Sequence, residues 1–288
     1  MSIVKMSAPL TGSVTDEITL ATAFQAAKPF SAFVDVFFVH RDPREAIPYS
    51  EMTLVPEIIQ SLIDTELEIQ RVAGESARRS FASAAVEHGA VILGVPSPRK
   101  DVTTSIRDVV GHLPSVLASA AILSDLVIVP PVTEGDGGAA HDALVRVLTK
   151  VGRPVLLCAS DKPMQLGKKI AIGWDGRDAA AKALVAAVPF FEKAESVELI
   201  SVGNLRPEDS SITDAREFLA LHDIRCAERV IQRGPRGIAD TLVDAARNSG
   251  CDLLVVGGYG HSRLVESIFG GVTDSIVSHP QLPILMVH

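Results

Sequence analysis

Short apolar runs alternate with longer segments in which apolar residues recur at helical spacing along most of the chain. Residues 196–202, for example, form a run of strand length, and the Ala-rich segment 178–195 before it has helical periodicity. Alternating strands and helices predict a parallel, doubly wound α/β sheet. In the second half, we expect strands at 169–174, 196–202, 227–232, 253–256 and 283–287, and helices at 178–195, 209–223, 237–249 and 266–278.

The first half shows the same order of elements with weaker boundaries. Its pattern predicts a parallel sheet of the same kind. The expected strands are 3–7, 33–40, 90–95, 126–130 and 154–159, and the expected helices are 16–27, 57–88, 105–121 and 139–150.

Two local patterns occur once in each half. Asp125 and Asp252 each precede four apolar residues, and Pro154 and Pro283 each open a short apolar strand. Both pairs recur at nearly the same offset, which indicates a tandem duplication. The segment between the halves is polar and contains Pro and Gly, as expected of a linker. We therefore expect two domains, at 1–160 and 168–288.

The composition fits a globular protein with a sizeable core. The 288 residues are 47% hydrophobic and 22% charged, and the formal net charge is −8. This charge argues against a broad surface for nucleic acid or anionic membranes, because both need clustered Lys and Arg. There is no signal-peptide pattern and no apolar run approaching the ~20 residues that span a bilayer. We expect a cytoplasmic protein whose three cysteines are reduced thiols.

A glycine-rich loop directly follows the expected strand 253–256. Gly257 and Gly260 are separated by two residues, and nine more residues separate Gly260 from Gly270, where a helix is expected to begin. In open parallel sheets, ligands bind beyond the carboxyl ends of the strands. Glycines let backbone N–H groups approach an anion, and a helix N-terminus adds further donors. The loop is therefore a candidate phosphate cradle, and the Thr273 hydroxyl could contribute to it.

This spacing resembles the nucleotide motif of the universal stress protein (UspA-like) family, Gly-x2-Gly-x9-Gly-(Ser/Thr). The resemblance covers residues 169–288, and it covers the first half by element order only. It implies two tandem Rossmann-like domains of the adenine nucleotide alpha hydrolase type. Each would be a five-stranded parallel sheet with helices on both faces. It also implies that the two halves pair as an intrachain pseudo-dimer, through the edge strands 154–159 and 283–287.

The resemblance also implies a set of ligand-binding positions. Gly271 departs from the motif, because the family has Ser or Thr there. The missing hydroxyl contact would be worth about 0.5–1.5 kcal/mol if neutral. The positions carried over are Gly173, Asp175, Val202, Val256, Gly257, Tyr259, Gly260, Gly270, Gly271, Val272 and Thr273.

A structural role is the alternative interpretation of these residues. The glycines could simply end a strand and open a helix, and Asp175 taken alone is better explained as a cap of the next helix. The first half lacks the motif. It has no Asp that matches Asp175, and Glu134 and Asp136 would repel a phosphate. We therefore expect the first half to be degenerate for nucleotide.

The resulting expectation is a stress-response regulator that binds ATP or a related adenine nucleotide in its C-terminal domain, with Mg²⁺ as an optional ion. We expect no enzyme activity. The whole chain could also form a homodimer. The sequence contains no P-loop, no dinucleotide fingerprint and no Gly-x-Ser-x-Gly elbow, and its histidines do not form a zinc pattern. The alternatives are a scaffold protein with structural glycines and a weak nucleotide hydrolase.

Overall fold

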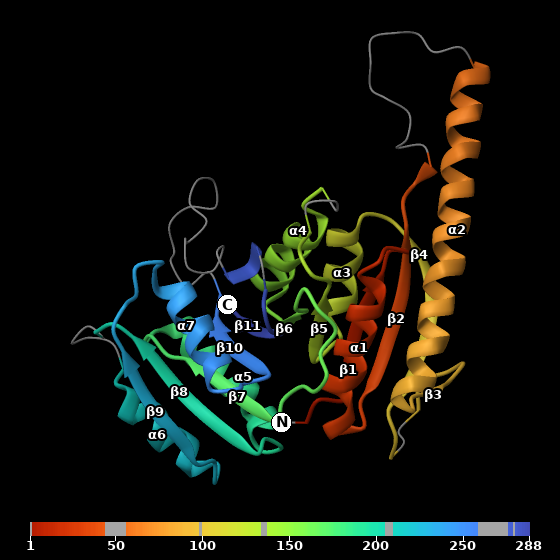
Figure 1. Ribbon diagram of the computed structural model, residues 1–288. Helices are drawn as coiled ribbons and strands as arrows, with labels where there is room; N and C mark the ends of the chain where they lie inside the picture. Colours follow the sequence, from red (N-terminus) through yellow and green to blue (C-terminus); the bar gives the residue numbers. More distant parts are fainter. Residues whose placement is uncertain are drawn as a thin grey trace.

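The computed structural model describes residues 2–43, 56–97, 100–133, 137–204, 210–258, 276–278 and 280–288. Its strands form a single sheet of 11 strands in the order β3-β4-β2-β1-β5-β6-β11-β10-β7-β8-β9. Helices cover both faces of this sheet (Figure 1). The architecture is the α/β, Rossmann-like arrangement expected from the alternating pattern.

The first half supplies one flank of the sheet and ends in the short strand β6. The elements are β1 (Lys5–Leu10), α1 (Asp16–Ala27), η1 (Lys28–Phe30), β2 (Phe33–His40), α2 (Pro56–His88), β3 (Val91–Ile92), β4 (Thr103–Val110), α3 (Leu113–Ala121), β5 (Leu126–Val129), α4 (Ala139–Arg146), the π-helical turn η4 (Val147–Val151) and β6 (Val155–Leu157).

The second half supplies the other flank and ends in β11. Every expected strand of this half is present, with ends shifted by one residue or less. The elements are β7 (Lys169–Gly173), α5 (Asp178–Phe191), β8 (Ser196–Val202), α6 (Ile212–Leu221), β9 (Cys226–Ile231), α7 (Ile238–Asn248), β10 (Leu253–Gly257) and β11 (Ile284–Val287). The expected helix 266–278 lies outside the described residues except for its last turn, 276–278.

The two halves meet at an antiparallel pair of strands. Within each half the pairing is parallel, but β6 pairs with β11 in the opposite sense, and Leu156 faces Leu285 across the junction. This is the strand pairing expected between the halves. It covers one edge of each half-sheet, which would otherwise offer unpaired N–H and C=O groups to other chains.

The repeated Asp residues perform the same structural task in each half. The Asp125 carboxylate accepts hydrogen bonds from the N–H groups of Val4 and Lys5, at 2.8 and 3.0 Å, where β1 begins. The Asp252 carboxylate accepts from Gly167, Lys168 and Lys169, at 2.8–3.3 Å, where β7 begins. Each carboxylate thus satisfies backbone donors that precede the first strand of its half.

The repeated prolines also correspond. The carbonyl of Pro154 accepts from Val127, and the carbonyl of Pro283 accepts from Leu254, both at 3.0 Å. Each proline therefore lies beside the strand that follows the repeated Asp. The sequence repeat that indicated a duplication is a repeat of these two contacts.

One expected helix is largely wrong. Residues 105–121 were expected to be helical, but Thr103–Val110 is strand β4 and the helix begins only at Leu113. The β-branched residues Thr103, Thr104 and Ile106 favour an extended strand, and Pro114 lies in the first turn of the helix, where proline is well tolerated.

The strand count of the first half differs as a consequence. β4 pairs with β2, and the expected strand 90–95 is reduced to the two-residue strand β3, which pairs with the other edge of β4. The second half has the expected five strands, and the described part of the first half has six.

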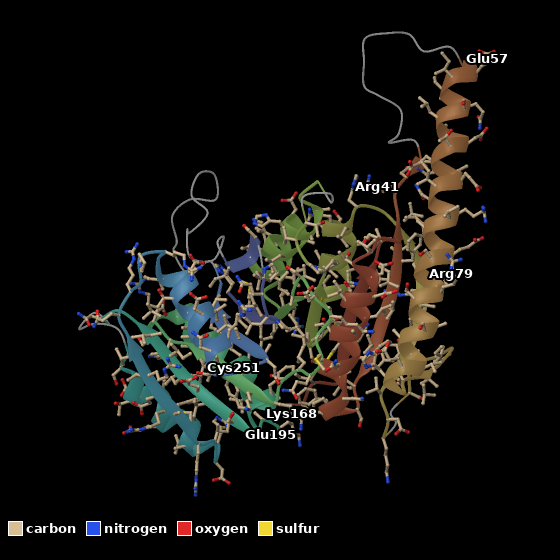
Figure 2. The ribbon with its side chains drawn as sticks, viewed as in Figure 1. Arg41, Glu57, Arg79, Lys168, Glu195 and Cys251 are labelled. Atoms are coloured by element: carbon tan, nitrogen blue, oxygen red, sulfur yellow. The ribbon has the colours of Figure 1, made fainter. Side chains whose placement is uncertain are left out.

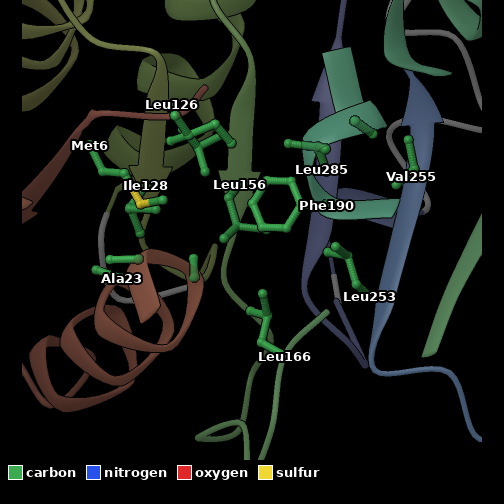
Figure 3. Packing of buried hydrophobic residues seen from close by; sticks show 14 of the residues in the cluster. Met6, Ala23, Leu126, Ile128, Leu156, Leu166, Phe190, Leu253, Val255 and Leu285 are labelled. Atoms are coloured by element: carbon green, nitrogen blue, oxygen red, sulfur yellow. The ribbon is translucent and has the colours of Figure 1, made fainter. Parts of the chain in front are cut away.

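Both faces of the sheet have cores that run through the two halves. One core joins residues of α1 and α2 with residues of α5 and α6, and the other joins α3 and α4 with α7. At the junction, Phe190 of α5 lies beside Leu156 of β6 and close to Leu285 (Figure 3). Phe190 also packs edge-to-face on Phe30 of the first half, with ring centroids 5.0 Å apart. The two halves therefore share their hydrophobic interior.

Two further expectations concern the thiols and membrane association. Cys158 is buried, Cys226 and Cys251 are half-buried, and all three are free thiols. Burial raises the pKa of the Cys158 thiol to about 12, so this sulfur stays protonated. Among the described residues, no helix has the length and apolar character needed to cross a membrane.

Candidate functional site

Three adjacent strands place candidate residues at one edge of the sheet. β7 lies between β10 and β8, and all three run parallel. Gly173 ends β7, Val202 ends β8, and Val256 and Gly257 end β10. The fold therefore brings these four residues to the carboxyl edge, where ligands of doubly wound sheets bind.

Gly257 allows a helix to approach the end of β10 very closely. A Cβ atom at this position would lie 2.5 Å from the backbone carbon of Ala179 and 2.5 Å from the nitrogen of Ala180. These atoms belong to the first turn of α5, whose N-cap residue Arg177 supplies no side-chain cap hydrogen bond. The first N–H groups of a helix have no intrahelical acceptors, and its N-terminus carries a partial positive charge. Gly257 therefore places this first turn at the carboxyl edge.

Gly173 and Gly258 also have packing roles. A Cβ at Gly173 would lie 2.6 Å from Leu242 Cδ2 of α7. A Cβ at Gly258 would meet Met286 Cε at 3.2 Å and Leu148 Cδ1, from the first half, at 3.4 Å. The structural interpretation of the glycines thus holds for Gly173, Gly257 and Gly258, whether or not a ligand binds beside them.

Asp175 is exposed in the turn between β7 and α5. Its Oδ1 accepts a hydrogen bond from the N–H of Arg177 at 3.1 Å, so the side chain shapes the turn. The idea that Asp175 caps α5 is therefore wrong, because the N-cap residue is Arg177. The preceding residue, Trp174, is buried and donates its indole N–H to the Ser210 carbonyl at 3.2 Å.

The remaining candidate ligand-binding residues lie outside the described part of the chain. Tyr259, Gly260, Gly270, Gly271, Val272 and Thr273 lie outside the described residues, as do Glu134 and Asp136 of the first half. Of the expected phosphate cradle, the structure therefore describes only the strand end that precedes it. In the described ranges, no cluster of three or more His, Cys, Asp or Glu side chains could hold a metal ion.

The loop after β9 adds basic residues that are not part of the glycine motif. Arg233 and Arg236 are exposed in residues 232–237, at the same edge of the sheet. Arg236 pairs with Asp244 of α7, and the Thr241 hydroxyl accepts from the N–H of Gly234 at 3.0 Å. The Gly-Pro-Arg-Gly run at 234–237 was a sequence signal for a turn at this edge.

The corresponding edge of the first half is filled by the protein itself. Asp16, in the first turn of α1, is buried, and its carboxylate accepts from the N–H groups of Thr11 and Gly12 at 3.0 and 2.9 Å. A Cβ at Gly12 would lie 2.5 Å from the Cβ of Ala73 in α2. The donors after β1 are therefore occupied by an internal carboxylate, and α2 packs directly against them.

Comparison with known proteins finds a family that resembles the second half and solved structures that resemble the whole chain. The model of the universal stress protein family matches residues 167–288. A universal stress protein from Archaeoglobus fulgidus DSM 4304 has a TM-score of 0.67 at 14% sequence identity, over 98% of this chain and 97% of that chain. A putative universal stress protein from Pseudomonas aeruginosa UCBPP-PA14 has a TM-score of 0.54 at 14% identity, over 99% of this chain and 93% of that chain.

At this identity, the likeness to the solved structures concerns the fold of the whole chain. The search of curated proteins gave no match. The family model covers the half of the chain in which the glycine loop follows β10. Residues 167–288 therefore match the universal stress protein family, and the chain as a whole has the fold of these solved universal stress proteins.

Proposed function

We propose that the C-terminal half binds ATP or a related adenine nucleotide at the carboxyl edge of β10, β7 and β8, and that this binding serves a stress-response regulator. The observation that carries the proposal is the convergence of Gly173, Val202 and Gly257 at this edge, beside the first turn of α5. The same edge in the first half has its donors filled by Asp16. Binding is therefore proposed for one half only.

The chemical fit rests on three features of the described residues. The half-buried Val202 offers apolar surface for a base, with the buried Val256 at the neighbouring strand end. The exposed Asp175 carboxylate offers acceptors for ribose hydroxyls. The first turn of α5 offers N–H donors for an anion. Mg²⁺ usually keeps several waters and takes phosphate oxygens as ligands, so it would need few ligands from the protein.

We propose a binding role without catalysis. The edge contains no nucleophile–base pair among its described residues, and Asp175 is engaged with the backbone of its own turn. A weak hydrolase and a scaffold with structural glycines are the competing functions. The scaffold function is supported by the packing at Gly173 and Gly257, because close packing explains both glycines without a ligand.

Calorimetric titration with ATP, ADP and AMP tests the proposal. The wild-type protein should bind at least one of them with one site per chain. Asp175→Asn should weaken the affinity about tenfold, because one hydrogen bond to a charged group is worth roughly 1.5 kcal/mol. Its thermal stability without nucleotide should stay close to that of the wild type, since the side chain is exposed.

Asp223→Asn is the matched control. Asp223 is also exposed and lies in the same half, but it precedes β9 and therefore sits at the opposite edge of the sheet. Its φ of 59° is one that Asn tolerates well. The control should bind nucleotide like the wild type. Absence of heat with all three nucleotides, together with no rise in melting temperature, would exclude the binding function and leave the scaffold.

A further inference from the structure

Helix α2 extends far beyond the sheet that it covers. Its C-terminal part packs through the buried residues Ala77, Phe81, Ala84 and Ala85. The N-terminal part of α2 projects past the end of β2 (Figure 1), and none of the side chains of residues 57–72 is buried. Helices in proteins owe most of their stability to tertiary packing, and an isolated segment of this length is marginal in water. Gln70 donates a hydrogen bond to the Arg41 carbonyl at 2.9 Å, but the projecting segment, residues 57–72, buries no side chain against the described part of the chain.

A coiled-coil seam runs along the projecting segment. Ile58, Leu62, Thr65, Ile69 and Val72 follow one another at alternating spacings of four and three residues, as a and d positions do. Ile58, Ile69 and Val72 are 47%, 57% and 50% exposed. The seam lies roughly 130° around the helix from the core-facing row. It is therefore a separate apolar surface, and not a frayed end of the core.

Charges divide along the same helix. All charged residues of the segment 57–70 are acidic, whereas the segment 71–79 is mainly basic. Arg79 is exposed near the middle of α2 and Glu57 lies at its tip, as Figure 2 shows. Glu75 is the only acid in the basic segment. The acids of the first segment are Glu57, Asp64, Glu66 and Glu68, and the bases of the second are Arg71, Arg78 and Arg79.

We propose that the projecting segments of two copies of this chain pair as an antiparallel, two-fold symmetric coiled coil centred near residue 67. This register places Leu62 opposite Val72, Thr65 opposite Ile69, and Ile58 opposite Ser76. The acidic tip of each helix then lies beside the basic segment of the other, with Glu57 near Arg79. A parallel pair would instead set four acids against four acids.

A second copy is the occupant that the residues favour. A two-fold rotation places the seam of one copy on the seam of the other, and the acidic segment of each copy beside the basic segment of the other. Such self-complementarity is what an isologous interface requires. The strands β6 and β11 are already paired with each other. A dimer formed through a short helical seam should be weak, with a dissociation constant of micromolar order.

Sedimentation equilibrium of the full chain, over about two decades of micromolar concentration, tests this dimer. The wild type should show a reversible monomer–dimer equilibrium. Ile69→Asp should raise the dissociation constant at least tenfold, because it places a charge in the centre of the seam. Leu67→Asp is the matched control. Leu67 is 49% exposed and lies two positions before Ile69, so it is about 200° away around the helix.

A charge swap tests the antiparallel direction. Glu57→Arg and Arg79→Glu should each weaken the dimer severalfold, and the double variant should recover most of the wild-type affinity. All substituted side chains are exposed, and far-UV circular dichroism checks that each variant keeps its helix content. A wild type that stays monomeric overturns the proposal. So does a dimer that Ile69→Asp and Leu67→Asp affect equally, or a double charge variant weaker than both single ones.

Discussion

At the scale of single residues, buried and half-buried carboxylates organise the ends of the first strand in each half. Asp125 and Asp252 bind the backbone before β1 and β7, whereas Asp16 binds the backbone after β1. Burial raises the pKa of Asp16 to about 6, against which its hydrogen bonds from Thr11 and Gly12 act only in part. Burial likewise raises the pKa of Asp252. These carboxylates are therefore held at a cost in desolvation.

The pKa of Asp16 gives the stability of the protein a defined pH dependence. The folded value lies above the unfolded value of 3.8, so the folded state binds this proton more tightly. The contribution of Asp16 to stability is therefore largest below pH 4 and falls as the pH rises through about 6. The change should amount to roughly 2–3 kcal/mol, at about 1.4 kcal/mol per pKa unit.

Urea unfolding of the wild type and of Asp16→Asn across pH 4–7 measures this effect. The difference in unfolding free energy between the two proteins isolates Asp16 from the other carboxyl groups. The wild type should lose stability relative to the variant as the pH rises. Two curves that run parallel over the whole range would show that the folded pKa of Asp16 is not raised.

At the scale of elements, close approach between helix and strand fixes how α5 lies on β10. The backbone of Ala179 and Ala180 occupies the space that a side chain at Gly257 would need. Backbone atoms cannot rotate away as a flexible side chain can. The identity of residue 257 is therefore decided by an element that precedes it by more than seventy residues in the chain.

Gly257→Ala should destabilise the protein by about 1–3 kcal/mol, the usual cost of overpacking a well-filled interior. Urea unfolding monitored by circular dichroism gives this value. Gly94→Ala is the control, because nothing lies within 4 Å of a Cβ at Gly94. It should change stability by no more than about 0.5 kcal/mol. Equal effects of the two substitutions on the unfolding free energy would show that the close contact with Ala179 does not exclude a side chain at position 257.

At the scale of the whole molecule, the continuous sheet and the shared cores make the two halves one folding unit. Leu156 and Leu285 pair across the junction, and residues of both halves line both cores. An isolated half would expose β6 or β11 together with the apolar surface beside it. We therefore expect the halves to unfold together, in a single cooperative transition.

Leu156→Ala tests this cooperativity. Loss of this buried side chain should cost about 2–5 kcal/mol. The protein has one tryptophan, Trp174, so its fluorescence reports only on the second half, whereas circular dichroism reports on both. The substitution in the first half should lower the melting temperature by the same amount with both probes. An unchanged fluorescence transition would show that the halves unfold independently.

The sequence by itself determined the fold class, the duplication and nearly all element positions in the second half, and the family resemblance implied the pairing of the halves. Hydrophobic periodicity and the Asp and Pro positions at strand starts are local signals, because each is defined by residues only a few positions apart. The glycine spacing likewise indicated the family before any coordinates. These features can be recognised in the sequence because buried side chains recur with the period of the helix or strand that carries them.

Only the tertiary structure decided the remaining features. Residues 103–110 became a strand because β2 pairs with them, and Asp16 became the internal ligand of Thr11 and Gly12 because α1 turns it inward. The close contact at Gly257 and the exposed seam of α2 likewise depend on which segments meet and which do not. Such contacts join residues far apart in the chain, so no local pattern of amino acids can encode them alone.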